Sequence, residues 1–171
     1  MTRVVGIDPG LAATGIGVVA GNGLRVDGFA YGEVRTRPRT PVPERLGRIH
    51  DRIAEVLSAE RPDLMVVEAV FSLERYPASG LTLGKVIGVI LLAAYRAGVS
   101  AVEVPVREAK RVLTGNGAAG KAQLEAAVRR TLNLVDPIRP FHASDALALA
   151  LVGLYRHASP LSPSFRAACD P

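Results

Sequence analysis

The stretch Val4-Val5-Gly6-Ile7-Asp8-Pro9-Gly10 decides the first part of the fold. Its apolar run Val4–Ile7 predicts a short strand, and Asp8-Pro9-Gly10 is a turn signal. Two more β-rich runs, Thr14–Ala20 and Leu24–Val34, follow on either side of a second glycine-containing turn. Three strands joined by short turns of this kind predict an antiparallel meander.

Beyond the meander, the hydrophobic periodicity alternates between helix and strand. Pro43-Glu44 opens a helix that ends at Pro62-Asp63. The continuous apolar run Leu64–Val67 predicts a buried parallel strand, and Ala101–Val104 predicts another. Further helices are expected over four ranges: Gly80–Ala97, Val106–Leu113, Lys121–Leu132 and Ala143–His157. The order predicts an α/β domain over residues 1–157, with a five-stranded mixed sheet and helices on both faces. Residues 158–171 are expected to form a flexible tail.

The helix expected over Gly80–Ala97 is apolar around nearly its whole circumference. Such a helix needs cover on both sides. One side can face the sheet, and the other can face either a second subunit or another part of the same chain. Gly84 and Gly88, four residues apart, would allow close backbone approach on that second side.

The composition excludes several classes of protein. A length of 171 residues is typical of one domain. The single cysteine, Cys169, rules out a disulfide framework and a thiolate metal site. The longest uncharged stretch, Pro9–Leu24, is 16 residues long and rich in glycine, shorter than a bilayer span. Together with a start that lacks the plan of a signal peptide, this predicts a soluble cytoplasmic protein.

The net charge is +5, from 21 Lys and Arg against 16 Asp and Glu. Only Lys85, Lys110 and Lys121 are lysines, so the basic residues are mostly arginine. Basic residues concentrate in the windows 35–52 and 107–130, a pattern that fits an electrostatic footprint for nucleic acid. A solvated basic face, or a GC-rich genome that replaces Lys by Arg, would give the same count.

Three carboxylates are expected at the ends of secondary-structure elements. Asp8 follows the first expected strand, Glu68 follows the fourth, and Asp145 is expected in the first turn of the last helix, with His142 on the same helical face. If the first and fourth strands are parallel neighbours, Asp8 and Glu68 lie side by side. Taken singly, each residue is compatible with a turn, a solvated strand end or a helix terminus. Clustered together, three carboxylates are normally stabilised by divalent metal.

The glycine-rich loop Gly115–Lys121 imitates nucleotide-binding motifs. Ala122 stands where a P-loop needs Ser or Thr, and a helix rather than a strand is expected before the loop. We therefore expect a flexible loop that carries Lys121 to a phosphate.

The chain resembles the RuvC family of Holliday junction resolvases, which have an RNase H-like fold. The resemblance covers residues 2–157 and rests on these motifs: Val5–Gly10 with Thr14-Gly15, Val67-Glu68 with Phe71, Pro43–Leu46, Lys110 with Lys121, and His142-x-x-Asp145-Ala146-Leu147-Ala148.

The resemblance implies a homodimer that binds four-way junction DNA and nicks two strands of like polarity, leaving 5′-phosphate and 3′-hydroxyl ends. It implies a catalytic, metal-binding set of Asp8, Glu68, His142 and Asp145 that holds two Mg²⁺ or Mn²⁺ ions. Because His142 stands where many members have Asp, its nitrogen would favour Mn²⁺ somewhat. The DNA contacts implied are Phe71, Arg75, Tyr76, Lys110 and Lys121. A RuvAB branch-migration complex is the expected partner.

Three other functions compete with this interpretation. The strand-Asp-Gly-hairpin opening also occurs in kinases and ATPases of the actin type, which need a second nucleotide-binding domain that 171 residues cannot hold. A related nuclease acting on structured RNA, or a junction-binding module without catalysis, would share the fold.

Overall fold

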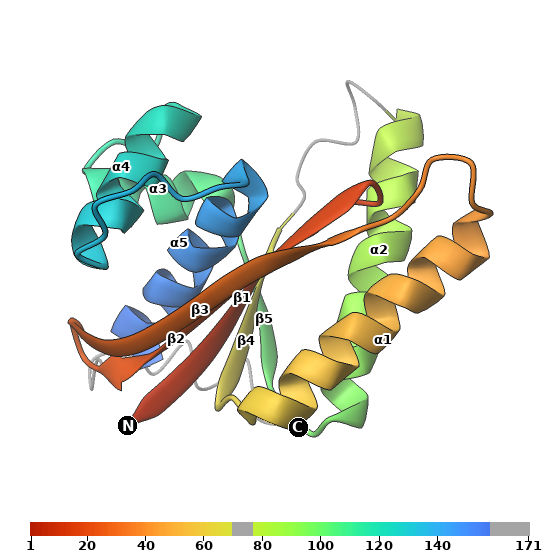
Figure 1. The fold of residues 1–171 in the computed structure, drawn as a ribbon, viewed down its shortest axis with the longest axis horizontal. Helices are drawn as coiled ribbons and strands as arrows, with labels where there is room; N and C mark the ends of the chain where they lie inside the picture. The colour runs from red at the N-terminus through yellow and green to blue at the C-terminus, as the bar shows by residue number, and fades with distance from the viewer. Residues whose placement is uncertain (70–76, 158–171) are drawn as a thin grey trace.

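Five strands form one mixed sheet in the order β3-β2-β1-β4-β5 in the computed structural model of the chain, which describes residues 1–69 and 77–157 (Figure 1). The strands are β1 (Thr2–Asp8), β2 (Ala13–Asn22), β3 (Arg25–Arg35), β4 (Leu64–Glu68) and β5 (Ala101–Val104). The first three pair antiparallel, and β4 and β5 run parallel to β1. The predicted meander and the two parallel strands are confirmed.

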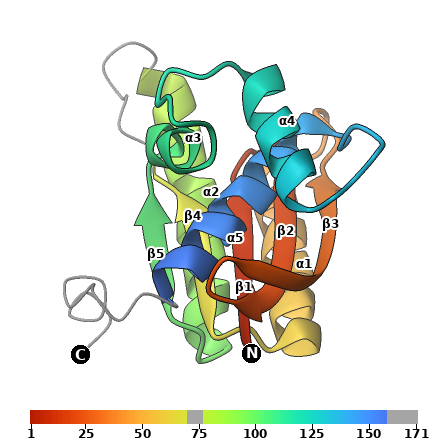
Figure 2. The same ribbon diagram turned by 90° about the vertical axis from the view of Figure 1, so that its left-hand side faces the viewer.

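Helices cover both faces of this sheet, as the sequence predicts. The helices are α1 (Val42–Glu60), α2 (Pro77–Arg96), α3 (Val106–Thr114), α4 (Lys121–Thr131) and α5 (Phe141–His157). Figure 1 shows α1 and α2 on one side of the sheet and α5, with α3 and α4 outside it, on the other. Figure 2 shows α5 running diagonally across its face of the sheet.

One face of α1 packs on the sheet. Ile49, Ile53 and Leu57 are buried, and Leu46 packs against the same cluster from its edge. Together with α2 they cover the branched side chains of β1 and β2, which gives this side an ordinary helix-on-sheet core.

The α5 side is built differently, because glycines in the strands let the helix come close. A Cβ atom on Gly6 would lie 2.0 Å from the carbonyl oxygen of Ala146, and one on Gly17 would lie 2.6 Å from the nitrogen of Leu147. Gly15 is equally constrained, since its Cβ would lie 2.0 Å from the carbonyl oxygen of His142. Only glycine permits this contact between backbones.

Helix α2 is covered on one side only within the single chain. Val86, Ile90 and Ala94 are buried, whereas Leu81 and Tyr95 are 68% and 82% exposed. By length and composition the window 79–96 could cross a membrane, but 33% of it is buried against the rest of the chain. That share is what a surface helix with one packed face shows.

The last helix begins earlier than predicted. The structure starts α5 at Phe141, two residues before the expected Ala143, and the carbonyl of Pro140 accepts a hydrogen bond from the backbone N–H of Ala143. The expectation that Asp145 lies in the first turn is therefore wrong: it lies one turn inside the helix. A proline fits well at the entry to a helix, which allows the earlier start.

Candidate active site

The first two acids lie at adjacent strand ends. Strands β1 and β4 are parallel, with Ile7 opposite Val67, so the next residues along, Asp8 and Glu68, leave the sheet side by side. Carboxyl ends of parallel strands are where sites form in α/β sheets. The parallel neighbours assumed in predicting this pair are confirmed.

Helix α5 brings the other two predicted residues to the same place. The close approach at Gly15 fixes the first turn of α5 over the end of β2, which directs His142 toward β1. The Nδ1 atom of His142 lies 2.6 Å from Oδ2 of Asp8, a hydrogen bond between residues 134 positions apart. Asp145, one turn further on, is 8% exposed, as is Asp8.

These side chains line one cavity of about 310 Å³ together with two lysines. Lys110 comes from α3, and Lys121 is the first residue of α4. The complete lining is Asp8, Pro9, Glu68, Leu83, Val106, Lys110, Lys121, His142 and Asp145. The cavity thus combines a concentrated negative charge at its base with two cations at its wall, an arrangement suited to a phosphate that must be held beside carboxylates.

Burial raises the pKa values of the two acids on the strands. The pKa of Glu68 is raised to about 8 by burial, by its hydrogen bond with Asp8 and by the charges of Asp8 and Asp145. The pKa of Asp8 is raised to about 6 by burial, and the hydrogen bond from Glu68 opposes that rise. Burial and the proximity of the two carboxyl groups thus favour keeping a proton on this pair of acids.

Asp145 completes the electrostatic picture. Burial raises its pKa, and the charges of Lys121, His142 and Lys110 oppose the rise. For all three acids burial is the largest cause of the raised pKa, so the fold holds these carboxyl groups where their charged form is poorly solvated.

The same hydrogen bonds explain how the side chains are oriented. Asp8 bonds both His142 and Glu68, so these groups point at one another. Among the residues that the structure describes, no three acidic or histidine side chains surround a common point. The oxygen and nitrogen donors line one cavity. The hydrogen bonds of Asp8 with His142 and with Glu68 keep these three side chains close together.

The glycine-rich loop before α4 forms an ordered turn between α3 and the lysine at the start of α4. It follows a helix, since Gly115 ends α3 in the left-handed conformation at φ 75°. The Asn116 side chain accepts a hydrogen bond from the N–H of Ala118, at 2.9 Å, and so orders the turn. The loop places Lys121 in the lining of the acidic cavity, and its contact with a phosphate stays a prediction.

The structure brings together the predicted catalytic residues and the predicted pair Lys110 and Lys121. The other predicted DNA contacts, Phe71, Arg75 and Tyr76, lie outside the described residues, as does the expected tail 158–171. Pro9, Leu83 and Val106 also line the cavity, and sequence reasoning missed them because apolar residues carry no chemical signal. The signal that could have found the close approach of α5 is the run of glycines on alternate positions of β1 and β2.

An RNase H-like sheet that gathers buried acids at the carboxyl ends of β1 and β4 defines a nuclease-type fold and site. Comparison with known proteins narrows this class. The model of the family described as "Crossover junction endodeoxyribonuclease RuvC" matches residues 4–153. The chain therefore belongs to the RuvC family.

Curated relatives carry the same description. One from Rhodopirellula baltica is 38% identical over 158 residues, covering 92% of this chain and 89% of the relative. One from Alkalilimnicola ehrlichii is 42% identical over 156 residues, covering 91% and 93%. The similarity thus spans nearly the whole of each chain.

Solved structures agree in fold. The structure titled "T. thermophilus RuvC in complex with Holliday junction substrate" has a TM-score of 0.86 and 38% identity, and the match covers 92% of this chain and 96% of that one. A yeast mitochondrial Holliday junction resolvase has a TM-score of 0.62 at 12% identity, which shows the fold alone.

Proposed function

We propose that this protein resolves four-way DNA junctions by nicking two strands of like polarity. The observation that carries the proposal is the cavity in which Asp8, Glu68 and Asp145 face Lys110 and Lys121. A relative with a TM-score of 0.86 is described in complex with a Holliday junction, which supports the choice of substrate. The ends produced are a 5′-phosphate and a 3′-hydroxyl, which a ligase can seal.

The residues present fit divalent metal. Carboxylate oxygens are the ligands that Mg²⁺ and Mn²⁺ prefer, and Asp8 and Glu68 present such oxygens at a partly buried site where the charge of Asp145 raises their pKa values further. Asp8, Glu68, Asp145 and His142 would hold two such ions. Bound divalent ions lower the pKa of water and stabilise charge on the attacking and leaving oxygens.

The chain's own residues supply the rest of the chemistry. Lys110 and Lys121 lie on one wall of the cavity and bind the non-bridging oxygens of the scissile phosphate. Apolar Leu83 and Val106 close the same cavity and limit access of bulk water. Burial and the charges of Asp8 and Asp145 raise the pKa of Glu68 to about 8, so Glu68 would lose its proton when cations bind beside it.

The catalytic assignment is tested with Asp8→Asn, which keeps the size of the side chain and removes its charge. We expect binding of a synthetic four-way junction to be retained and cleavage to fall on the order of 10³-fold or more. Gel-shift and single-turnover nicking assays measure the two effects. Substantial cutting by the variant would sink the assignment.

His142 sets the proposed preference for Mn²⁺ over Mg²⁺. An imidazole nitrogen is a softer donor than a carboxylate oxygen and lowers the negative charge of the site. The replacement His142→Asp should move the ratio of the Mn²⁺ and Mg²⁺ cleavage rates toward Mg²⁺. An unchanged ratio would refute the role given to His142.

The exposed face of α2 is the proposed homodimer interface. Leu81, Leu92 and Tyr95 are exposed along it, and a Cβ on Gly84 or Gly88 would meet nothing within 4 Å in the single chain. An apolar stripe with two glycines at its centre fits a second copy of the same helix. We expect a dimer by light scattering and a monomer for Leu92→Glu; an unchanged dimer would reject this interface.

The proposed substrate also implies a cellular location and a protein partner. We place the protein in the cytoplasm, where chromosomal junctions arise, with a RuvAB branch-migration complex as the partner that delivers them. Binding to that complex on junction DNA, measured by pull-down with the purified components, tests the partnership. Absence of binding would contradict it.

A further inference from the structure

The motif Pro43–Leu46, at the start of α1, has no role in the active site described above. Its arginine, Arg45, turns back across the preceding loop and donates a hydrogen bond from Nε to Oγ1 of Thr36, at 2.7 Å. Thr36 is one of the few buried polar residues, at 9% exposure. A buried hydroxyl with fixed partners on both sides holds the segments that it joins.

Thr36 connects Arg45 to the turn that follows Asp8. Its hydroxyl donates to the carbonyl oxygen of Leu11 at 2.5 Å, and its backbone N–H donates to the carbonyl oxygen of Ala12 at 3.0 Å. Leu11 and Ala12 follow Pro9, which lines the acidic cavity directly after Asp8. Arg45, Thr36 and the turn 9–12 thus form one continuous hydrogen-bonded chain, here called the Thr36 clamp.

The turn is held from the opposite side as well. Thr14 is fully buried, donates from its hydroxyl to the carbonyl oxygen of Gly10 at 2.8 Å, and accepts from the N–H of Gly10 at 3.3 Å. The turn after Asp8 is therefore fixed by one threonine from within and by the clamp from outside.

The clamp also fixes a loop that carries positive charge. Residues 36–41 connect β3 to α1 at the end of the molecule where the β1–β2 turn lies (Figure 1). The N–H of Thr40 donates to the carbonyl oxygen of Arg37 at 3.1 Å, which closes a turn with Pro38 at its favoured second position. Arg37 and Arg39 are exposed on this turn, here called the arginine loop.

Two neighbouring arginines differ from Arg37 and Arg39 in being paired with an acid. Arg35 pairs with Glu33, and Arg52 pairs with Glu55. Within residues 1–69 and 77–157, neither Arg37 nor Arg39 forms a salt bridge. Two uncompensated guanidinium groups on a rigid turn are suited to bind phosphate oxygens.

We propose that Arg37 and Arg39 bind backbone phosphates of a duplex arm and that the Thr36 clamp holds this arm in register with the catalytic carboxylates. Phosphate contacts position a protein on DNA without reading its sequence. The clamp would carry such a contact over into the position of the scissile phosphate, because the loop is hydrogen-bonded to residues three and four positions after Asp8. Thr36 and Arg45 are positioning residues, and this inference rests on the proposed function.

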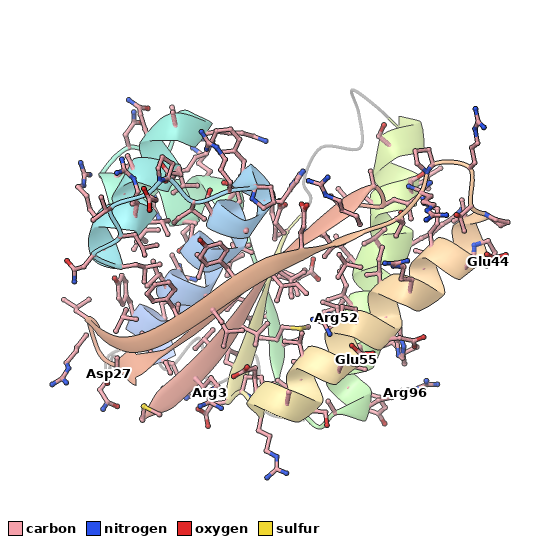
Figure 3. All side chains as sticks on the ribbon, viewed as in Figure 1. Arg3, Asp27, Glu44, Arg52, Glu55 and Arg96 are labelled. Atoms are coloured by element: carbon pink, nitrogen blue, oxygen red, sulfur yellow. The ribbon has the colours of Figure 1, made fainter. Side chains whose placement is uncertain are left out.

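The charge contribution is tested with the double variant Arg37→Gln/Arg39→Gln. We expect weaker binding of a four-way junction and a slope of log K against log salt that is shallower by about 1.8 per subunit, since each lost phosphate contact removes about 0.9. The matched control is Arg25→Gln/Arg96→Gln, which loses the same formal charge away from the arginine loop; Asp27, the partner of Arg25, and Arg96 are labelled in the lower part of Figure 3. Equal slopes in the two double variants would overturn the arginine loop as a binding surface.

The clamp is tested with Thr36→Val, which keeps the shape of the side chain and removes its hydroxyl. We expect binding and salt slope near those of the wild type, at least a tenfold slower single-turnover cleavage, and nicks spread over more positions. Thr36→Ser keeps the hydroxyl and should restore both rate and position. If Thr36→Val and Thr36→Ser cut at the same rate and positions, the clamp has no positioning role.

The two proposals fail separately. If the wild-type protein binds the junction without cutting it, the nuclease function is wrong. The salt slopes of the two double variants still decide whether the arginine loop binds DNA in that case.

Discussion

On the face of the sheet covered by α5, Gly6, Gly15 and Gly17 contribute no side chain, whereas on the opposite face Ile7 and Ile16 fill the space with branched side chains. These residues alternate along the same two strands. The bare face lets the backbone of α5 approach to contact distance and brings His142 within 2.6 Å of Asp8. The filled face forms the ordinary core with α1 and α2. The comparison teaches that the position of α5, and of His142 beside Asp8, depends on side chains being absent at three positions of one face.

The largest effect should come from placing a side chain on the bare face. Gly15→Ala would put Cβ 2.0 Å from the carbonyl oxygen of His142 and 2.4 Å from its carbonyl carbon, both backbone atoms rather than the end of a flexible side chain. We expect a loss of about 1–3 kcal/mol or more in the free energy of unfolding and loss of junction cleavage. Urea denaturation and a nicking assay measure both.

Gly32→Ala is the matched control for that change. Gly32 lies on β3, where a Cβ would meet nothing within 4 Å. We expect its stability to stay within about 0.5 kcal/mol of the wild type. If the two alanine variants were equally stable and active, the close approach of α5 would not matter to the site.

A smaller effect concerns the charge gathered at the end of the bare face. Glu68 has an ordinary pKa of 4.5 and a folded-state pKa of about 8. Between these values the unfolded chain releases a proton that the folded chain keeps, so rising pH favours unfolding. In the presence of a chelator, we expect the free energy of unfolding to fall between pH 5 and pH 8 by roughly 1–3 kcal/mol more than in Glu68→Gln.

Denaturation at the two pH values checks this, and Mg²⁺ added at pH 8 should restore the lost stability by binding the folded state. If the stability of the wild type changed with pH as that of Glu68→Gln does, folding would not raise the pKa of Glu68.

The smallest effect is expected on the filled face. Ile53 of α1 is fully buried there, and Ile53→Val removes one methylene group from a core that contains no catalytic residue. The expected loss is about 0.5–1.5 kcal/mol, with junction cleavage unchanged at 25 °C. A cleavage defect larger than the stability loss would show that the two faces are coupled more closely than their packing indicates.

The sequence predicted the elements, their order and the pairing of Asp8 with Glu68, because apolar runs, turn residues and strand-end acids are local signals. It could not show why Gly15 matters, since the contact is with His142, more than a hundred residues away. The Thr36–Arg45 hydrogen bond was equally hidden, because it depends on how the loop between them folds. The sequence predicts the start of α5 two residues late, because a proline before a helix does not by itself fix where the helix begins.

The central claim is that the protein cuts four-way DNA junctions at the cavity lined by Asp8, Glu68, His142 and Asp145. The most direct measurement incubates the wild-type protein with a synthetic mobile four-way junction, each strand labelled in turn, in Mg²⁺ or Mn²⁺. The account predicts paired nicks at symmetrical positions in two strands of like polarity, ligatable ends, and no comparable cutting of linear duplex or structured RNA. Unpaired nicks, or equal cutting of linear duplex, would contradict it.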